Sequence, residues 1–260
     1  RYKFDGCTSS GAVEYAGEND HNALIAGFIG NSANGSSTGT FINCTSSGSV
    51  KHTGDMTSAS RNLFIGGYIG YVPELKGLIS FTGCTHSGTV LANGRCQSST
   101  RNGGFVGGAY GPLKFTSCLN SGSVTSNIKT TSGAKCNVLT SGFVGDNQHA
   151  NATITFVAAD ASQNIAPCKN TGTITLTGHM GGGTYYGRAS GIANADYGGG
   201  ILTAYDVINE GQIVAKDLTG SSSGGYIQVG GIAGCHIANS KWINVVNKGD
   251  ILVENVKVKY

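Results

Sequence analysis

The feature that most constrains the fold of this chain is a short motif that returns along its whole length. The motif reads C-x-x-x-G-x-V/I, and Val replaces Cys in the last two copies. Its first position is occupied in turn by Cys7, Cys44, Cys84, Cys118, Cys168, Val207 and Val245. Self-similarity with a period of ~20–50 residues is typical of proteins whose repeats stack on one another. The motif therefore predicts a repeat protein.

A second motif, G-aromatic-aliphatic-G, lies between successive copies of the first. It starts at Gly27, Gly67, Gly104 and Gly142, with weaker forms at Gly191 and Gly231. An apolar residue precedes the Cys position by three, as at Phe4, Phe41, Phe81, Phe115, Ile165, Ala204 and Trp242. After the Gly of the first motif, apolar residues alternate, as in Val90 and Ala92, which is the period of a strand. Each copy thus predicts three short strands.

One such unit cannot bury its apolar face alone, but copies laid on one another bury a continuous core. Glycines recur where tight corners need positive φ or close backbone approach. Length differences fall in Ser/Gly/Asn-rich segments such as 31–39, 94–103 and 219–225, which we interpret as loops. We expect an all-β, right-handed parallel β-helix (β-solenoid) of about six three-strand coils, with residues 1–260 forming a single domain.

Composition excludes several classes of protein. The 43 glycines come with only 3 prolines and 12% charged residues, which is not the composition of a disordered chain. The net charge of +3 is scattered rather than gathered into a basic stripe, so no nucleic-acid partner is predicted. No apolar run approaches the ~20 residues of a membrane-spanning helix, so no membrane span is predicted.

The two motifs together resemble a known repeat. The stretch G-G-Y-I-G from Gly66, followed by C-T-H-S-G-T-V from Cys84, is similar to the GLUG-motif repeat of surface adhesin-like and autotransporter-like proteins. The resemblance extends copy by copy over nearly the whole chain. It implies a solenoid at the cell surface and no catalytic residues.

The eight cysteines fall into two kinds. In-register stacking would place the motif cysteines at ~4.8 Å spacing, within reach of disulfides such as Cys7–Cys44 and Cys84–Cys118. Alternatively, Cys fills this position as a small apolar core residue, as Val does in the last copies. Cys96 and Cys136 lie instead in inserts of neighbouring copies, and a loop disulfide between them is the preferred pairing. Such a bond would imply an oxidising compartment.

Asparagines carry two further predictions. Asn34, Asn43 and Asn151 begin N-x-S/T sequons and are candidate N-glycosylation sites if the chain follows a eukaryotic secretory route. A different column, two residues before the Gly of the first motif, holds Asn120, Asn170, Asn209 and Asn247. Stacked amides at a turn can hydrogen-bond along the axis. We expect this column to be structural.

No pattern of catalytic, cofactor-binding or metal-binding residues stands out, so the chain is predicted not to be an enzyme and to need no cofactor. The 14 carboxylates occupy unrelated repeat positions, whereas glycosidases need a carboxylate pair. Glu18, Asp20 and His21 cluster in one stretch where a cation could bind, although solvated loop side chains are the commoner case.

The terminal strands suggest how the protein works. Tyr2 and Phe4 start the chain within a repeat, and Val256, Val258 and Tyr260 alternate at its end. A head-to-tail interface between such coils is open and builds filaments. The predicted function is a non-enzymatic extracellular or cell-surface structural or adhesive protein, with itself as partner and surface glycans as a further one. The alternative is a carbohydrate-binding or carbohydrate-cleaving β-helix, with candidate aromatic residues Tyr185, Tyr186, Tyr197 and Tyr226.

Overall fold

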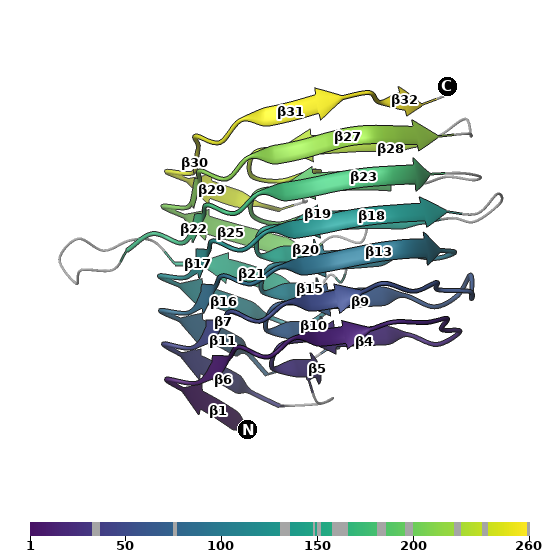
Figure 1. The fold of residues 1–260 in the computed structure, drawn as a ribbon. Coiled ribbons are helices and arrows are strands. Elements are labelled where there is room, and N and C mark those ends of the chain that lie inside the picture. The colour runs from purple at the N-terminus through teal and green to yellow at the C-terminus, as the bar shows by residue number, and fades with distance from the viewer. Residues whose placement is uncertain are drawn as a thin grey trace.

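The computed structural model is an all-β stack of parallel strands (Figure 1). It describes residues 1–32, 37–74, 77–130, 136–147, 149, 152–157, 166–180, 186–195, 200–220, 225–235 and 239–258. Within these ranges the chain forms no helix, and every strand pairing is parallel. The predicted β-solenoid is confirmed.

Three sheets follow one another through the first half of every coil. Sheet A contains β1 (Tyr2–Asp5), β6 (Gly39–Ile42), β11 (Ile79–Thr82), β16 (Leu113–Thr116), β21 (Thr153–Phe156), β25 (Ile201–Tyr205) and β29 (Lys241–Ile243). Sheet B contains β2 (Thr8–Ser9), β7 (Thr45–Ser46), β12 (Thr85–His86), β17 (Leu119–Asn120), β22 (Lys169–Asn170), β26 (Ile208–Asn209) and β30 (Val246–Asn247). Sheet C contains β3 (Val13–Tyr15), β8 (Val50–His52), β13 (Val90–Cys96), β18 (Val124–Thr130), β23 (Ile174–Met180), β27 (Ile213–Gly220), β31 (Ile251–Glu254) and β32 (Lys257–Val258).

Two further sheets complete the coil. Sheet D contains β4 (Ala23–Ala26), β9 (Leu63–Gly66), β14 (Thr100–Gly103), β19 (Asn137–Ser141), β24 (Tyr186–Ser190) and β28 (Tyr226–Gly230). Sheet E contains β5 (Ile29–Asn31), β10 (Ile69–Val72), β15 (Val106–Ala109) and β20 (Val144–Asn147). Six coils pass through sheets A to D, and a seventh begins with β29, β30 and β31.

The division of the coil is finer than predicted: the first four coils have five strand segments in place of three, and the next two have four among the described residues. The second motif does not form a strand of its own, because its first Gly lies at the turn from sheet D into sheet E. A two-residue strand of sheet B also separates the corner after sheet A from sheet C. Sequence periodicity could not resolve such short pieces, since two residues show no alternation.

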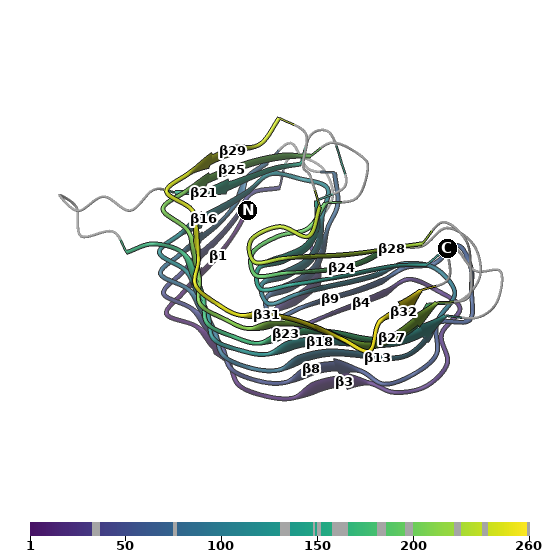
Figure 2. The ribbon, with the colours of Figure 1, turned by 90° about the horizontal axis from the view of Figure 1, so that it is seen from above.

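Seen along the axis, the coil is bent into two lobes (Figure 2). The chain runs counter-clockwise from β29 to β31 in this view while rising towards the viewer, which is a right-handed winding. Sheets A and E enclose one hydrophobic core, which we name the aromatic lobe. Sheets C and D enclose the other, which we name the aliphatic lobe.

Rings fill the aromatic lobe in two ladders along the axis. In sheet A, Phe4, Phe41, Phe81, Phe115 and Phe156 stack with centroids 4.9–5.0 Å apart. Opposite them, Phe28, Tyr68, Phe105 and Phe143 stack at 4.8–5.0 Å. The expected ladder position of Ile165 is therefore taken by Phe156, and Ile165 itself lies outside the described residues.

Left-handed backbone turns the chain from sheet A into sheet B. The residue after the sheet A strand has φ of 63° at Gly6, 49° at Asn43, 61° at Gly83, 52° at Ser117 and 51° at Asp206. Only Gly adopts this region without cost, and Asn and Asp tolerate it better than other residues. The corner thus keeps its geometry in these five coils although its residue type varies.

The bend between the lobes depends on the first Gly of the second motif. At Gly104, an added Cβ would lie 2.2 Å from the Gly142 carbonyl oxygen and 2.6 Å from Asn120 Oδ1. No side chain fits in that space, so the backbone at Gly104 directly contacts a column of polar side chains in sheet B. This column, which we name the bend column, consists of Ser9, Ser46, His86, Asn120, Asn170, Asn209 and Asn247.

Candidate functional site

The open face of the C-terminal coil is the most distinctive surface of the molecule. Apolar side chains that are buried in inner coils are exposed here: Trp242 is 36%, Ile251 46% and Val253 53% exposed. Their equivalents one coil below, Ala204, Ile213 and Ala215, are fully buried. The face thus presents the cores of both lobes without a covering layer among the described residues.

A hollow of about 750 Å³ opens on this face, at the end of the aromatic lobe. It is lined by Ile232, Ala233, Cys235, Asn239, Ser240, Trp242 and Val245. Ile232 continues the column of Phe143 and Ile192, and Trp242 continues the column of Phe156 and Ala204. The hollow therefore lies where the next pair of ladder rings would be.

The opposite, N-terminal face presents rings at the same columns. Phe4, Tyr2 and Phe28 pack on the aromatic core and are only partly buried. Phe4 contacts Phe28 edge to face at 5.6 Å. The two predicted assembly residues of β1, Tyr2 and Phe4, therefore lie on this face. At the other end, Val256 packs on the aliphatic core, β32 with Val258 pairs with β27, and Tyr260 lies outside the described residues.

The bend column carries a directional chain of hydrogen bonds to the open face. The Asn120 amide donates to Asn170 Oδ1 at 2.6 Å, Asn170 donates to Asn209 at 2.6 Å, and Asn209 donates to Asn247 at 2.7 Å. Each amide also donates to the carbonyl oxygen two residues on, as Asn247 does to Gly249 at 2.9 Å. Among the described residues Asn247 has no further acceptor above it.

Lower in the bend column, His86 replaces Asn. Its Nδ1 donates to Asn120 Oδ1 at 2.7 Å, and its Nε2 has no hydrogen-bond partner within the described structure. Burial lowers the pKa of His86 to about 4, so the ring is neutral at physiological pH. The column is the axial hydrogen-bond ladder predicted for the asparagines, extended by one imidazole.

The motif cysteines form a column of thiols inside the aromatic lobe. Cys44, Cys84, Cys118 and Cys168 are buried, and Cys7 is partly buried. The thiols of Cys44, Cys84 and Cys118 each donate to the carbonyl oxygen two residues earlier, at 3.2–3.5 Å. A hydrogen bond from Cys118, and then burial, raises the pKa of Cys84, whereas burial, and then a hydrogen bond from Cys168, raises the pKa of Cys118. This geometry favours the core interpretation over the Cys7–Cys44 and Cys84–Cys118 disulfides.

Cys96 and Cys136 lie close together, but in the aliphatic core and not in the loop expected for residues 94–103, most of which belong to β13 and β14. Both are fully buried thiols in the core of the aliphatic lobe. Cys96 ends β13, and Cys136 precedes β19 of the next coil. A hydrogen bond joins the two sulfurs, which lowers the pKa of Cys96 and raises that of Cys136.

Other candidate sites lie apart from this face. Asn43 is exposed at the corner after β6, where a glycan could attach, while Asn34 and Asn151 lie outside the described residues. Tyr186 and Tyr226 stack at 5.7 Å on sheet D, and Tyr226 is 53% exposed. Tyr185 and Tyr197 lie outside the described residues. Of the four candidate tyrosines, the described residues therefore provide one stacked pair.

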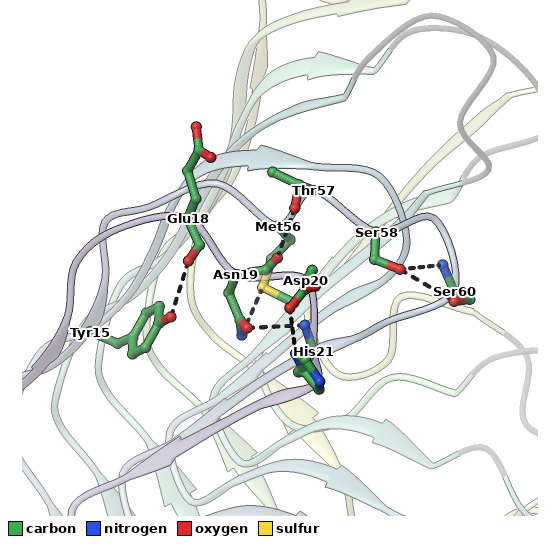
Figure 3. Close-up of polar contacts among 9 residues, drawn as sticks. All are labelled: Tyr15, Glu18, Asn19, Asp20, His21, Met56, Thr57, Ser58 and Ser60. Carbon is green, nitrogen blue, oxygen red and sulfur yellow. Dashed lines mark hydrogen bonds and ion pairs between the residues drawn. The ribbon is translucent and has the colours of Figure 1, made fainter.

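The acidic loop of the first coil does not converge on a cation position. Figure 3 shows the Asp20 carboxylate beside the His21 ring, whereas the Glu18 side chain points away from both. The Glu18 backbone carbonyl instead accepts a hydrogen bond from Tyr15 at 3.3 Å. Across the described ranges no three His, Cys, Asp or Glu residues gather in a way that could hold a metal ion.

A buried ion pair between sheets D and E was not predicted. Arg101 and Asp146 have side chains only 4% and 0% exposed, and the Arg101 guanidinium also lies 5.0 Å over the Phe64 ring. The two residues come from neighbouring coils at unequal repeat positions, so no column in the sequence signals the pair.

The hollow, by contrast, could be predicted from the sequence, because two of its lining residues, Ile232 and Val245, occupy repeat positions of the last coil.

The chain was compared with protein-family models, with curated proteins and with solved structures, and nothing matches. In the part of the chain that the structure describes, no helix is long and apolar enough to cross a membrane.

Proposed function

We propose that this chain is a non-enzymatic structural protein of the cell surface or extracellular space, whose coils stack head to tail on another copy. The observation that carries the proposal is the open apolar face of the C-terminal coil with its hollow. Exposed apolar patches of this kind mark interaction sites on soluble proteins. The surface location rests on the resemblance to GLUG-motif repeats.

The occupant that fits this face is the N-terminal coil of a second copy. Continuing the register of sheet A places Phe4 of that copy over Trp242. Continuing the column of the second motif would set its Phe28 over Ile232, so that both rings would enter the hollow. In the aliphatic lobe Val13 would cover Ile251. The same parallel stacking that holds the coils together would then run across the interface.

The bend column supports the same register between two copies. Asn247 is the last amide of the bend column, and Ser9 occupies the equivalent position in the first coil. The Ser9 hydroxyl already donates to the Gly27 carbonyl at 2.8 Å, so its oxygen is available as an acceptor. An Asn247 amide that donates to this oxygen would extend the ladder between copies. Pairing of the unpaired strand edges adds to this contact.

A charge on the open face tests the proposal. Val253→Asp places a carboxylate at an exposed position of β31, and Leu78→Asp adds the same charge at a 42% exposed position before β11. We expect the wild-type chain and L78D to sediment as concentration-dependent oligomers and to appear as filaments by negative-stain electron microscopy. V253D should sediment as a monomer with an unchanged circular dichroism spectrum. A wild-type chain that stays monomeric at high concentration contradicts the proposal.

Carbohydrate binding is the second candidate. It is supported by the exposed ring of Tyr226, stacked on Tyr186 and followed on the same strand by Gln228, which accepts a hydrogen bond from Arg188 at 2.7 Å. An aromatic face beside polar groups suits a sugar ring. Glycan-array binding that Tyr226→Ala abolishes would establish this function, and an empty array would remove it.

A further inference from the structure

We propose that an ion pair between Lys257 of one copy and Glu18 of the next selects the register of head-to-tail stacking and makes the stack sensitive to salt. This inference rests on the proposed function, because it concerns the contact between the C-terminal face of one copy and the N-terminal face of another. It follows from one column of side chains on the outer face of the stack, which we name the charge column.

The charge column runs the length of the stack, at the end of sheet C. Its first three members precede by one residue the bridged residues Asn19, Met56 and Cys96, and strand pairing aligns the others. Its carboxylates lie in the first two coils, whereas its lysine and arginine side chains lie in coils above them. In order the column consists of Glu18, Asp55, Arg95, Lys129, His179, Thr219 and Lys257.

An ion pair between two coils already forms within the charge column. Arg95 Nε and Nη2 lie 2.7 Å and 2.6 Å from Asp55 Oδ2. The hydrogen bond to Asp55 raises the pKa of Arg95, and the negative charge of Glu18 in the first coil raises it further. Opposite charges in register on adjacent coils can thus reach each other across the strand spacing of ~4.8 Å.

The two ends of the charge column are not paired in this way. Glu18 and Lys257 are exposed, and neither side chain forms an ion pair or a hydrogen bond with any residue that the structure describes. The Glu18 side chain also points away from Asp20 and His21 (Figure 3). A carboxylate on one end face and an ammonium group on the other are therefore available to a second copy.

The proposed stacking would set these two charges over one another. The strand segment that ends at Lys257 is one residue longer than the segment that ends at Glu18, because it contains the extra residue Asn255 with φ of 51°. The strand β27 has an equivalent extra residue, and β23 pairs with it on both sides of this bulge. A copy whose Val13 lies over Ile251 would therefore also have its Glu18 over Lys257.

Sheet A has a position of the opposite kind on the same face. Continuing its register would set Lys3 of the second copy over Lys241. Within one copy, Lys3 pairs with Asp5 at 2.9 Å, and Lys241 lies 5.4 Å over the Tyr205 ring. Replacing Lys by Glu should therefore act differently at the two positions, since it removes an attraction at Lys257 and a repulsion at Lys241.

The test mixes two charge-reversed variants of the full-length chain. Lys257→Glu and Glu18→Lys each set like charges together when a variant stacks on its own kind. At low salt each variant alone should raise the dissociation constant for stacking roughly fivefold in sedimentation velocity experiments, and added salt should reduce the difference from the wild-type chain. In an equimolar mixture, copies that alternate bring opposite charges together at every contact, so assembly should return to the wild-type level.

The matched control is Lys241→Glu, which makes the same change of charge on the same face. It should leave stacking as strong as in the wild-type chain or make it tighter, and circular dichroism checks that each variant folds. Wild-type assembly by Lys257→Glu, or a mixture that assembles no better than the single variants, overturns this inference while the stacking proposal stands. A wild-type chain that stays monomeric at high concentration overturns both.

Discussion

The aromatic lobe and the aliphatic lobe are wound from the same coils but are packed in different ways. In the aromatic lobe the same residue type recurs at one position, as in the ladder from Phe4 to Phe156. In the aliphatic lobe, Ile65 is followed in register by Asn102, and Asn102 donates to Ser126 at 3.3 Å. One lobe therefore gains from identical neighbours, while the other tolerates mixed polar and apolar contacts provided that its hydrogen bonds are made.

The largest expected effect comes from removing a ladder ring. Phe115→Ala should lower the free energy of unfolding by about 3–5 kcal/mol, because it leaves a cavity and removes stacking on both Phe81 and Phe156. Leu176→Ala in the aliphatic lobe, also fully buried, should cost about 1 kcal/mol less, since aromatic pairs add roughly 0.5–1.5 kcal/mol to burial. Urea unfolding followed by circular dichroism measures both. An equal or larger loss for Leu176→Ala would remove the proposed distinction between the lobes.

The bend column joins the two lobes, and its disruption should be nearly as costly. Asn170→Ala removes the acceptor of Asn120 and the donor to Asn209 and Gly172, all buried. Each of these three buried groups costs at least about 1 kcal/mol when it is left unpaired, so we expect a loss of at least about 3 kcal/mol in urea unfolding. The outer pair Asn93–Asn127, bonded at 2.9 Å, is the control, and Asn127→Ala should cost about 1 kcal/mol. Similar losses of stability at both positions would show that the hydrogen bonds of the bend column contribute no more than those of the outer Asn93–Asn127 pair.

Acid should weaken the bend through His86. Its pKa of about 4 in the folded chain lies below the ~6.5 of an unfolded chain, so the unfolded state binds more protons between these values. The free energy of unfolding should therefore be highest above pH ~6.5 and fall by about 3 kcal/mol as the pH drops to ~4.

The variant His86→Asn isolates this contribution, because Asn is the residue of the four following coils. We expect its stability to fall less than that of the wild-type chain over the same pH range in urea titrations. A residual fall is expected from His52, whose pKa burial also lowers. Parallel pH profiles for the variant and the wild-type chain would exclude His86 as the source.

The features that sequence could predict are those that repeat. Phe41 and Phe81, or Asn170 and Asn209, occupy one motif position, so in-register stacking brings them together. The proximity of Cys96 and Cys136 was predicted because both precede the second motif in adjacent copies, although Cys96 ends a strand and does not lie in a loop. Their disulfide and the glycosylation of Asn43 remain predictions.

The features that sequence could not predict depend on how one sheet meets another. The bend arises because Gly104 brings its backbone against Asn120, a contact between two different motif positions. The pair of Arg101 and Asp146 likewise joins unequal positions of two coils. Ile165 was misplaced because the spacing to Cys168 matched by chance, while the ring of Phe156, earlier in the chain, completes the ladder.

The register on either side of Phe156 has a consequence for how the surface can diversify. Phe156 pairs with Phe115 below and Ala204 above, and Asn170 pairs with Asn120 and Asn209, although more sequence separates Phe156 from Asn170 than separates their equivalents in neighbouring coils. The interior therefore does not dictate the length of the connection from sheet A to sheet B. A foreign peptide inserted at this point should therefore leave the register of both strands unchanged, so the length of this connection can vary while the framework is retained.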